Sequence, residues 1–256
     1  AGPFKEVEYK RTPDDEELIR SFTSLVDGSL GANFTKFPED ITEISDYACY
    51  YQTNLTSIEL PNNITKIGKC AFEGCANLVL TELPDDITSI GNSAFENCAK
   101  ITLTKLPSKL KTIGQMAFIS CKKLALTELP SGLTTLGSTS LRDTAITITE
   151  VPEGITELTN NCFYGCTKIE SLDCKGKISK VVSGAFTACS GLTKLIFSNI
   201  TEVPVLDNTD YTFSNTPITN GTGYIYVPDD LVESFKTATN WSNIAEQIKS
   251  LSELEV

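Results

Sequence analysis

Proline recurs at a fixed interval through the middle of this chain. The repeat prolines are spaced about 23 residues apart, with the last interval one residue shorter, and they are Pro38, Pro61, Pro84, Pro107, Pro130 and Pro152. An aromatic or leucine column keeps the same register, and its members are Phe72, Phe95, Phe118, Leu141, Phe163 and Phe186. A third column, mostly cysteine, holds Gln52, Cys75, Cys98, Cys121, Thr144, Cys166 and Cys189. Self-similarity at a period of roughly 20–50 residues predicts a chain of stacked supersecondary units.

Each unit has room for two short strands and a turn. In one unit the run Leu78–Leu83 partly alternates apolar and polar residues, which predicts a half-buried strand that Pro84 ends. The run Ile87–Ile90 predicts a second strand, and the following AFxxC stretch is long enough only for one helical or tight turn. Such a unit cannot bury its apolar side chains alone, whereas units stacked about 4.8 Å apart can. The sequence therefore predicts a solenoid with the phenylalanine column inside.

The unit LPxxIxxIGxxAFxxC resembles the leucine-rich repeat of BspA-like bacterial surface proteins, from about Asn33 to Phe197. The resemblance implies an α/β repeat solenoid, mostly β, wound as a right-handed coil of about seven units, each about 22–23 residues long. The fifth unit departs from the pattern, because Leu141 stands for phenylalanine and Thr144 for cysteine, and we expect a local change in curvature there. The seventh unit lacks its proline.

We expect covers at both ends, because an open solenoid exposes its last coil. Residues 1–32 form the predicted N-terminal helical cap, with a helix start at Thr12 and Pro13, and residues 33–205 form the repeat solenoid. Residues 206–256 form the predicted C-terminal strand–helix cap. Its helix is expected from about Asp229 to Ala238, and a second amphipathic stretch runs from Trp241 to Leu251. We expect Trp241 and Phe235 to pack within this cap, with an aromatic ligand platform as the alternative.

Composition excludes several classes of function. The chain has no histidine, which removes histidine-based triads, Cys-His pairs and histidine zinc ligands. The net charge is −12 and no stripe of Lys and Arg occurs, so we expect no nucleic-acid partner. No apolar run approaches the length of about 18 residues that a membrane span needs, so we expect no membrane insertion.

The cysteines and carboxylates predict no catalytic, cofactor or metal site. A recurring cysteine column is typical of small buried side chains whose thiols donate to a loop carbonyl. Zinc is the weaker alternative, because the pairs Cys162 with Cys166 and Cys70 with Cys75 are loosely spaced. Asp207 and Asp210 are a weak calcium candidate, and the Asp doublets read as helix starts or a turn instead of a facing catalytic pair.

Polar ladders on the strands are the candidate binding surface. The candidate contact residues are Glu59, Glu82, Glu128, Glu150, Thr81, Thr104, Thr127 and Thr149, with Lys105 in the glutamate column. Another ladder follows the prolines and comprises Thr42, Thr65, Thr88, Lys111, Thr134 and Thr156. These ladders indicate either a solvated β surface or a ridged binding face, and the sequence leaves open which ladder lies on the concave side.

The resemblance implies a non-enzymatic binding or adhesion module of an extracellular or cell-surface bacterial protein. We expect a monomer without cofactor that recognises a host or microbial protein or glycan, with any signal or anchor outside this chain. Because the C-terminal tail is similar to tails of prophage-encoded virion proteins, a virion- or tail-associated recognition protein is the first alternative. A glycan-active enzyme and a purely structural spacer are the others.

Overall fold

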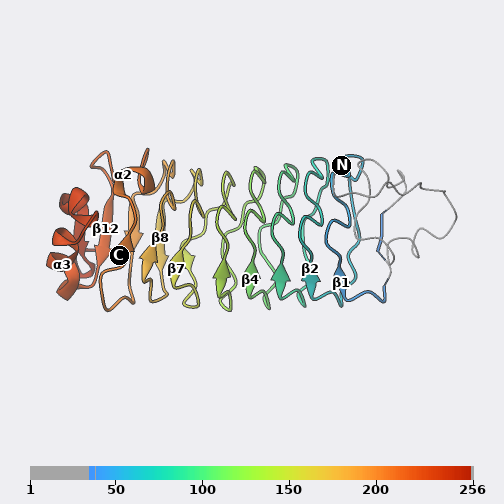
Figure 1. The fold of residues 1–256 in the computed structure, drawn as a ribbon, viewed down its shortest axis with the longest axis horizontal. Coiled ribbons are helices and arrows are strands. Elements are labelled where there is room, and N and C mark those ends of the chain that lie inside the picture. Colours follow the sequence, from blue (N-terminus) through green and yellow to red (C-terminus); the bar gives the residue numbers. More distant parts are fainter. Residues whose placement is uncertain (1–34, 38, 255–256) are drawn as a thin grey trace, which may run out of the picture.

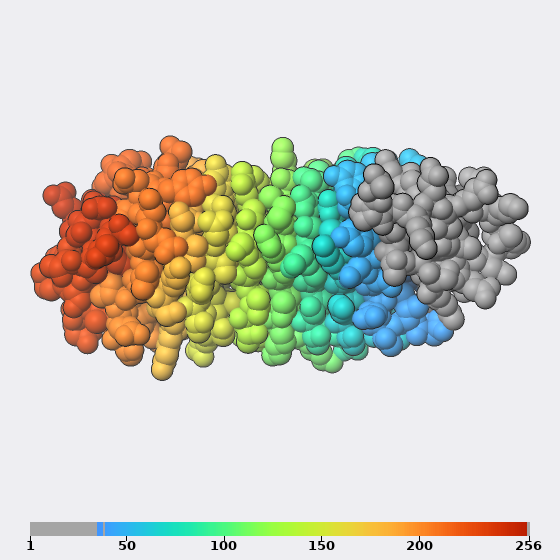
Figure 2. Space-filling model, viewed as in Figure 1, coloured from blue at the N-terminus to red at the C-terminus, as the bar shows by residue number. Residues whose placement is uncertain are grey.

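The chain winds into an elongated solenoid (Figures 1 and 2). Short parallel strands lie side by side along it (Figure 1). The computed structural model describes residues 35–37 and 39–254. The helix expected near Thr12 lies outside these residues. The predicted mostly β repeat solenoid is confirmed. We call each stretch that begins at a repeat proline a coil, so the fifth coil begins at Pro130 and the sixth at Pro152.

The run that follows each proline forms the most regular sheet, as predicted. Its first five strands are β1 (Glu43–Ile44), β2 (Lys66–Ile67), β3 (Ser89–Ile90), β4 (Thr112–Ile113) and β5 (Thr135–Leu136). The strands β7 (Glu157–Leu158), β9 (Lys180–Val181) and β11 (Val205–Leu206) form a second sheet of the same kind. The pairing is parallel and in register, so that Ile67 lies beside Ile90 and both are buried. Each buried side chain is therefore covered by its counterpart in the next coil.

The run before each proline behaves differently from our expectation. A strand over Leu78–Leu83 is wrong, because Thr81 and Glu82 are both exposed between the buried Leu80 and Leu83. Two successive outward side chains break the alternation that a regular ladder requires. This side of the solenoid becomes a sheet only in the C-terminal half. Its strands are β6 (Glu150–Val151), β8 (Ser171–Cys174), β10 (Lys194–Ile196), β12 (Tyr224–Val227) and β13 (Ile248–Ser250).

The AFxxC stretch is a run of tight turns that also joins the coils. The amide of Phe72 donates to the carbonyl of Ala94 in the next coil (2.8 Å), whereas the amide of Cys75 donates within its own coil to Phe72 (3.1 Å). This alternation places Gly74 at a φ of +72° and its counterpart Asn97 at +60°. Gly and Asn are the residues that adopt this left-handed conformation most readily.

The phenylalanine column lies inside the solenoid, as predicted. The rings of Phe72 and Phe95 are 5.3 Å apart, and those of Phe95 and Phe118 are also 5.3 Å apart, in nearly parallel stacks. A second stack contains Phe163, Phe186 and Phe213, with centroids 5.9 Å apart at each step. Leu141 separates the two stacks.

The C-terminal segment closes the last coil. Its helices are α2 (Thr209–Thr212), η1 (Asp229–Leu231), α3 (Val232–Thr237), η2 (Trp241–Gln247) and η3 (Leu251–Glu253), where η denotes a 3₁₀ helix. The expected helix after Asp229 is confirmed, but the stretch after Trp241 ends as the strand β13, which pairs with β12. Because β12 in turn pairs with β10, strands of the predicted cap continue the sheet of the solenoid. The division at residue 206 stays a prediction.

Trp241 and Phe235 pack within the cap, so the aromatic-platform alternative is wrong. Both side chains are 0 % exposed. The indole Nε1 of Trp241 donates to the carbonyl of Pro204 (2.7 Å), and its ring lies 5.0 Å from that of Phe235 and 6.1 Å from that of Phe197. The indole therefore ties the cap to the last coils by burial and by a hydrogen bond.

The fifth and sixth coils are joined less completely than the others. Within the described residues, no backbone hydrogen bond links 134–137 to 156–159, and the sheet of β1–β5 ends there. The hydroxyl of Thr159 donates instead to the carbonyl of Leu136 (3.0 Å). In the same region Ser140 replaces the alanine of earlier coils, and its buried Oγ has no hydrogen-bond partner among the described residues. We call this junction the seam.

Shortening Phe95 should be costly, because the ring is buried between two others. We expect Phe95→Ala to lower the free energy of unfolding by about 3–5 kcal/mol, through lost burial and a cavity. Chemical denaturation of both proteins measures the difference. A loss below about 1 kcal/mol would contradict the interior position of the column.

Removing the Ser140 hydroxyl should stabilise the chain. An unpaired buried hydroxyl costs about 1–3 kcal/mol, so Ser140→Ala should raise the free energy of unfolding by up to about that amount. Thr144→Ala is the matched control, because the buried hydroxyl of Thr144 donates to the carbonyl of Leu141 (2.7 Å) and its removal should destabilise. Denaturation curves in which Ser140→Ala destabilises as much as Thr144→Ala would show that Ser140 has a partner.

Candidate binding groove

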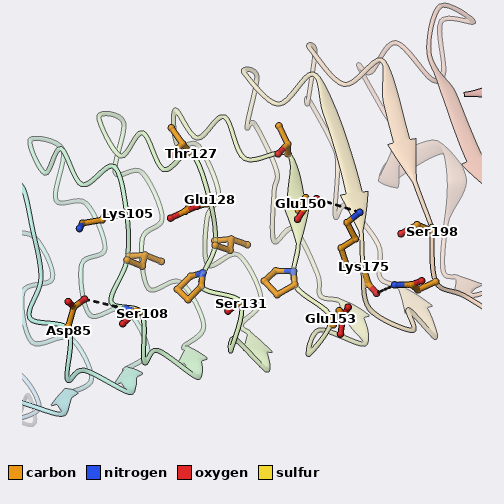
Figure 3. A pocket seen from close by; sticks show the side chains of 16 residues that line it. Asp85, Lys105, Ser108, Thr127, Glu128, Ser131, Glu150, Glu153, Lys175 and Ser198 are labelled. Atoms are coloured by element: carbon orange, nitrogen blue, oxygen red, sulfur yellow. Dashed lines mark hydrogen bonds and ion pairs between the residues drawn. The ribbon is translucent and has the colours of Figure 1, made fainter. Parts of the chain in front are cut away.

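A groove runs along the solenoid where the Thr-Glu or Thr-Lys segments lead into the prolines (Figure 3). It consists of two adjoining hollows with volumes of about 1160 Å³ and about 560 Å³. Both hollows are lined by Asp85, Lys105 and Leu106, so they continue one another along the rod. The groove extends from Lys36 near the described N-terminal end to Asn199.

Most of the candidate contact residues lie in this groove. The lining includes Glu59, Thr81, Glu82, Lys105, Thr127, Glu128, Thr149 and Glu150. Thr104 is exposed beside Lys105 but does not line either hollow. Their common exposure has a local cause, because each Thr-Glu or Thr-Lys pair stands between two inward-pointing apolar residues, as Thr127 and Glu128 do between Leu126 and Leu129. That they contact a partner stays a prediction.

The floor and the opposite wall of the groove were missed in the sequence. Leucine and proline side chains of successive coils form the floor, among them Leu83, Leu106, Leu129, Pro130 and Pro152. The opposite wall carries the polar residues that follow the prolines, namely Asp85, Ser108, Ser131 and Glu153. The signal in the sequence is the polar residue that follows each of the prolines Pro84, Pro107, Pro130 and Pro152, whereas our interpretation covered only Asp85 and Asp86, as a turn.

The threonine ladder that follows the prolines forms hydrogen bonds between coils. The hydroxyl of Thr88 donates to the carbonyl of Thr65 (3.1 Å), and that of Thr134 donates to the carbonyl of Lys111 (3.2 Å). In each case the acceptor lies in the preceding coil. None of this ladder lines the groove, whereas the hydroxyls of Thr81, Thr104, Thr127 and Thr149 donate to no described protein group. The ladder after the prolines therefore supports stacking, and the groove ladder leaves its hydroxyls open.

Ion pairs occupy the two ends of the groove. At the C-terminal end the Nζ of Lys175 lies 2.6 Å from Asp173 and 3.4 Å from Glu150, and Ser198 donates to Asp173 (2.8 Å; Figure 3 shows Lys175 with Glu150). The hydrogen bond to Asp173 is the main reason that the pKa of Lys175 is raised. At the other end Lys36 pairs with Glu39 at 2.6 Å. Among the described residues, Glu59, Glu82, Lys105 and Glu128 between these ends form no ion pair.

The cysteine column is structural, as predicted. The thiol of Cys98 donates to the carbonyl of Phe72 (2.9 Å), and that of Cys121 donates to Phe95 (3.0 Å), each in the preceding coil. Thr144 replaces this bond with one inside its own coil. Burial raises the pKa of Cys75 to about 12 and that of Cys166 to about 12, which keeps both thiols neutral at ordinary pH. All nine cysteines are free and buried.

The acidic side chains that were considered for metal binding or catalysis do not form a metal site in the described residues, and two of them have structural partners. The described part of the chain contains no group of three or more Cys, Asp or Glu side chains arranged to hold a metal ion. Asp207 pairs with Lys180 at 3.3 Å. Asp229 accepts hydrogen bonds from the hydroxyl of Ser250 and the amide of Ser252, which lower its pKa and fix the cap.

The buried thiols should make the fold sensitive to alkali. An exposed thiol in the unfolded chain ionises near a pKa of about 8.5. The folded chain holds the protons of Cys75 and Cys166 up to a pKa of about 12. The unfolded state therefore releases these protons first, and stability is full below about pH 8.5 and declines as the pH rises towards 12.

Denaturation midpoints between about pH 8 and pH 10 test this prediction. We expect a decline over this range, and a shallower one in Cys75→Ala, which removes one such thiol. Thr53→Ala, an exposed change in a neighbouring coil, should leave the slope as in the wild type. A slope that is the same with and without Cys75 would contradict the assignment.

Comparison with known proteins identifies the repeat. The model of the BspA type leucine rich repeat region matches residues 42–170 and 127–238, in six copies. A leucine-rich repeat protein of T. pallidum has a similar structure, with a TM-score of 0.56 and 31 % identity over 64 % of this chain and 80 % of that one. No curated protein sequence matches the chain.

A leucine-rich cell surface protein of Faecalibacterium prausnitzii has the same fold, with a TM-score of 0.50 and 22 % identity over 83 % of this chain. The match spans 62 % of that protein's length. In the described residues, no helix is both long enough and apolar enough to pass through a bilayer. The repeat period, the stacked columns and the matched family model agree, and the chain belongs to the BspA-type leucine-rich repeat family.

Proposed function

We propose that this chain is a non-enzymatic recognition module of an extracellular or cell-surface bacterial protein, and that it binds a macromolecule along the groove. Repeats of this family are consistent with protein interaction, and the name of the F. prausnitzii neighbour calls that protein a cell surface protein. Adhesion to a host or microbial surface is the corresponding role. In the alternative of a virion-associated protein, the same groove would bind the partner, but the chain would be part of a virion instead of a bacterial surface protein.

The contrast between the two threonine ladders carries this proposal. The ladder after the prolines uses its hydroxyls for coil-to-coil bonds such as that from Thr88 to Thr65. The groove ladder makes no such bond, and its hydroxyls stand beside carboxylates without ion pairs, as at Thr81 with Glu82 and Thr127 with Glu128. Stacking alone does not require these side chains. Solenoids commonly use such extended, regularly ridged surfaces to bind partners.

Blocking the groove should weaken recognition without harming the fold. We expect Thr127→Trp to fill part of the groove and to weaken binding by about tenfold or more, since interfaces depend on close fit at a few central positions. Lys123→Trp is the matched control, because Lys123 is exposed in the same coil but does not line the groove. The measurement is binding of the purified chain to immobilised extracellular-matrix proteins, serum proteins and bacterial cell-wall glycans.

Two results would contradict this proposal. One is binding to a component of the panel that both tryptophan variants retain at wild-type strength, which would move the contact to another surface. The other is the absence of any binding partner on the panel for the wild type, which would favour the structural-spacer alternative. Circular dichroism and melting of each variant check that the fold is kept.

A further inference from the structure

The signs of the charges along the groove differ from those of the ion-paired columns outside it. At two places outside the groove, consecutive coils pair opposite charges, since Glu43 lies 3.9 Å from Lys66 and Asp86 lies 2.5 Å from Lys109. In the groove column, whose members are one coil apart, Glu59 stands next to Glu82 and Glu128 next to Glu150. Like charges in register on neighbouring strands repel one another. Lys36 lies beside Glu59 in register and Lys175 lies 3.4 Å from Glu150, which offsets part of this repulsion, whereas Glu82 and Glu128 form no ion pair among the described residues. A bound cation would relieve the repulsion that remains.

Lys105 divides the column into two acidic pairs. It is exposed, lines both hollows and forms no ion pair with a described residue, although its neighbours one coil away are Glu82 and Glu128. Between Lys36 and Asp173, which flank it in register, the column thus presents two acids, one base and two acids. A uniformly basic ligand would meet repulsion at its centre, so this sign pattern favours a partner with separated cationic groups.

The lining favours a polypeptide over a sugar chain. Neither hollow is lined by Trp, Tyr or Phe among the described residues, whereas sugar-binding surfaces commonly stack aromatic rings on the sugar. The floor is built from leucine and proline side chains such as Leu106 and Pro130. Lys and Arg have apolar stems that can lie on such a floor while their charged ends reach a carboxylate.

The spacing of the two acidic pairs sets the spacing of the cations. Neighbouring strands lie about 4.8 Å apart, so the centres of the pairs Glu59 with Glu82 and Glu128 with Glu150, which are three coils apart, are separated by about 14 Å. Four residues of extended chain cover about 13 Å, and residues i and i+4 of such a chain point to the same side.

We infer that the groove binds an extended polypeptide segment with basic side chains at positions i and i+4, one at each acidic pair, and an acidic or neutral residue at i+2 facing Lys105. This inference rests on the proposed binding role of the groove. In this inference the two acidic pairs attract the basic side chains of the segment, and Lys105 selects against a third basic side chain between them. Charge complementarity contributes mainly to specificity and register.

Two labelled peptides with the same composition and net charge test the inference. The first contains Lys-Ser-Glu-Ser-Lys between serine flanks, and the second contains Lys-Lys-Ser-Ser-Glu between the same flanks. Fluorescence anisotropy at low salt measures their affinities for the wild-type chain. We expect the first peptide to bind about threefold to tenfold more tightly, because only it can place one cation at each pair. Equal affinities would overturn the inference.

Charge reversal locates the binding. The double variant Glu82→Lys with Glu128→Lys should lose the preference and about tenfold or more of the affinity for the first peptide. Its matched control is Glu202→Lys with Glu246→Lys, which changes the net charge equally at exposed acids outside the groove. An equal loss in the control would mean that the overall charge of −12 attracts the peptide, and this would overturn the inference.

Reversal of Lys105 tests its role in specificity. Lys105→Glu should lower the affinity for the first peptide and raise the affinity for a peptide that carries Lys-Ser-Lys-Ser-Lys between the same flanks. An unchanged preference between these two peptides would overturn the role of Lys105.

The binding panel with Thr127→Trp separates this inference from the proposed binding role of the groove. If glycans bind in a way that Thr127→Trp blocks while neither peptide shows a preference, the binding role of the groove stands and the cationic partner is wrong. If nothing on the panel responds to Thr127→Trp and neither peptide shows a preference, both are wrong.

Discussion

The hydrogen bonding of one coil to the next is the constraint on which the rest of this structure depends. No coil has a partner for all of its own backbone groups, because strands of two residues, such as Ser89–Ile90, cannot form a sheet alone. The next coil supplies these partners on the strand side through pairs such as Ile67 with Ile90, and on the turn side through bonds such as that from Phe72 to Ala94. An unpaired backbone group buried in the interior would be costly, so the register of each coil against the next is enforced at every step.

Because the coils stack in register, equivalent side chains of successive coils form columns. Some columns lie inside the solenoid and others are exposed to solvent. Interior columns must fit the copy above and below, which explains the stacked phenylalanines and the cysteines that donate to the preceding coil. Exposed columns have no such requirement, and their residues can change sign or type without harming the stack. Lys105 occurs where other coils carry glutamate, and the surrounding Leu103 and Leu106 remain buried as in the other coils. Recognition can therefore be altered in this fold while stability is kept.

The sequence was sufficient for those features that depend on one column at a time. The period placed Phe95 inside and Glu82 outside, and the size of cysteine predicted its buried hydrogen bond. It was insufficient where neighbouring positions act together. Alternation within Leu78–Leu83 suggested a strand, but Thr81 and Glu82 are two successive exposed residues, and both line the groove. The opposite wall and the floor combine residues of several coils, and no single repeat unit contains the groove.

The seam shows how a single shortened unit affects one side of the solenoid and spares another. The interval from Pro130 to Pro152 is one residue shorter than the intervals before it, and backbone bonding is lost between 134–137 and 156–159. On the groove side the ladder continues, because the amide of Asp173 donates to Thr149 (2.9 Å) and β6 pairs with β8. The groove therefore passes the seam without interruption. A partner that extends past Glu150 to Lys175 and Asn199 would touch coils on both sides, so that its binding and the closure of this weaker junction would stabilise each other. For such a partner, the irregular unit would link the local stability of the stack to the occupancy of the surface that we propose for recognition.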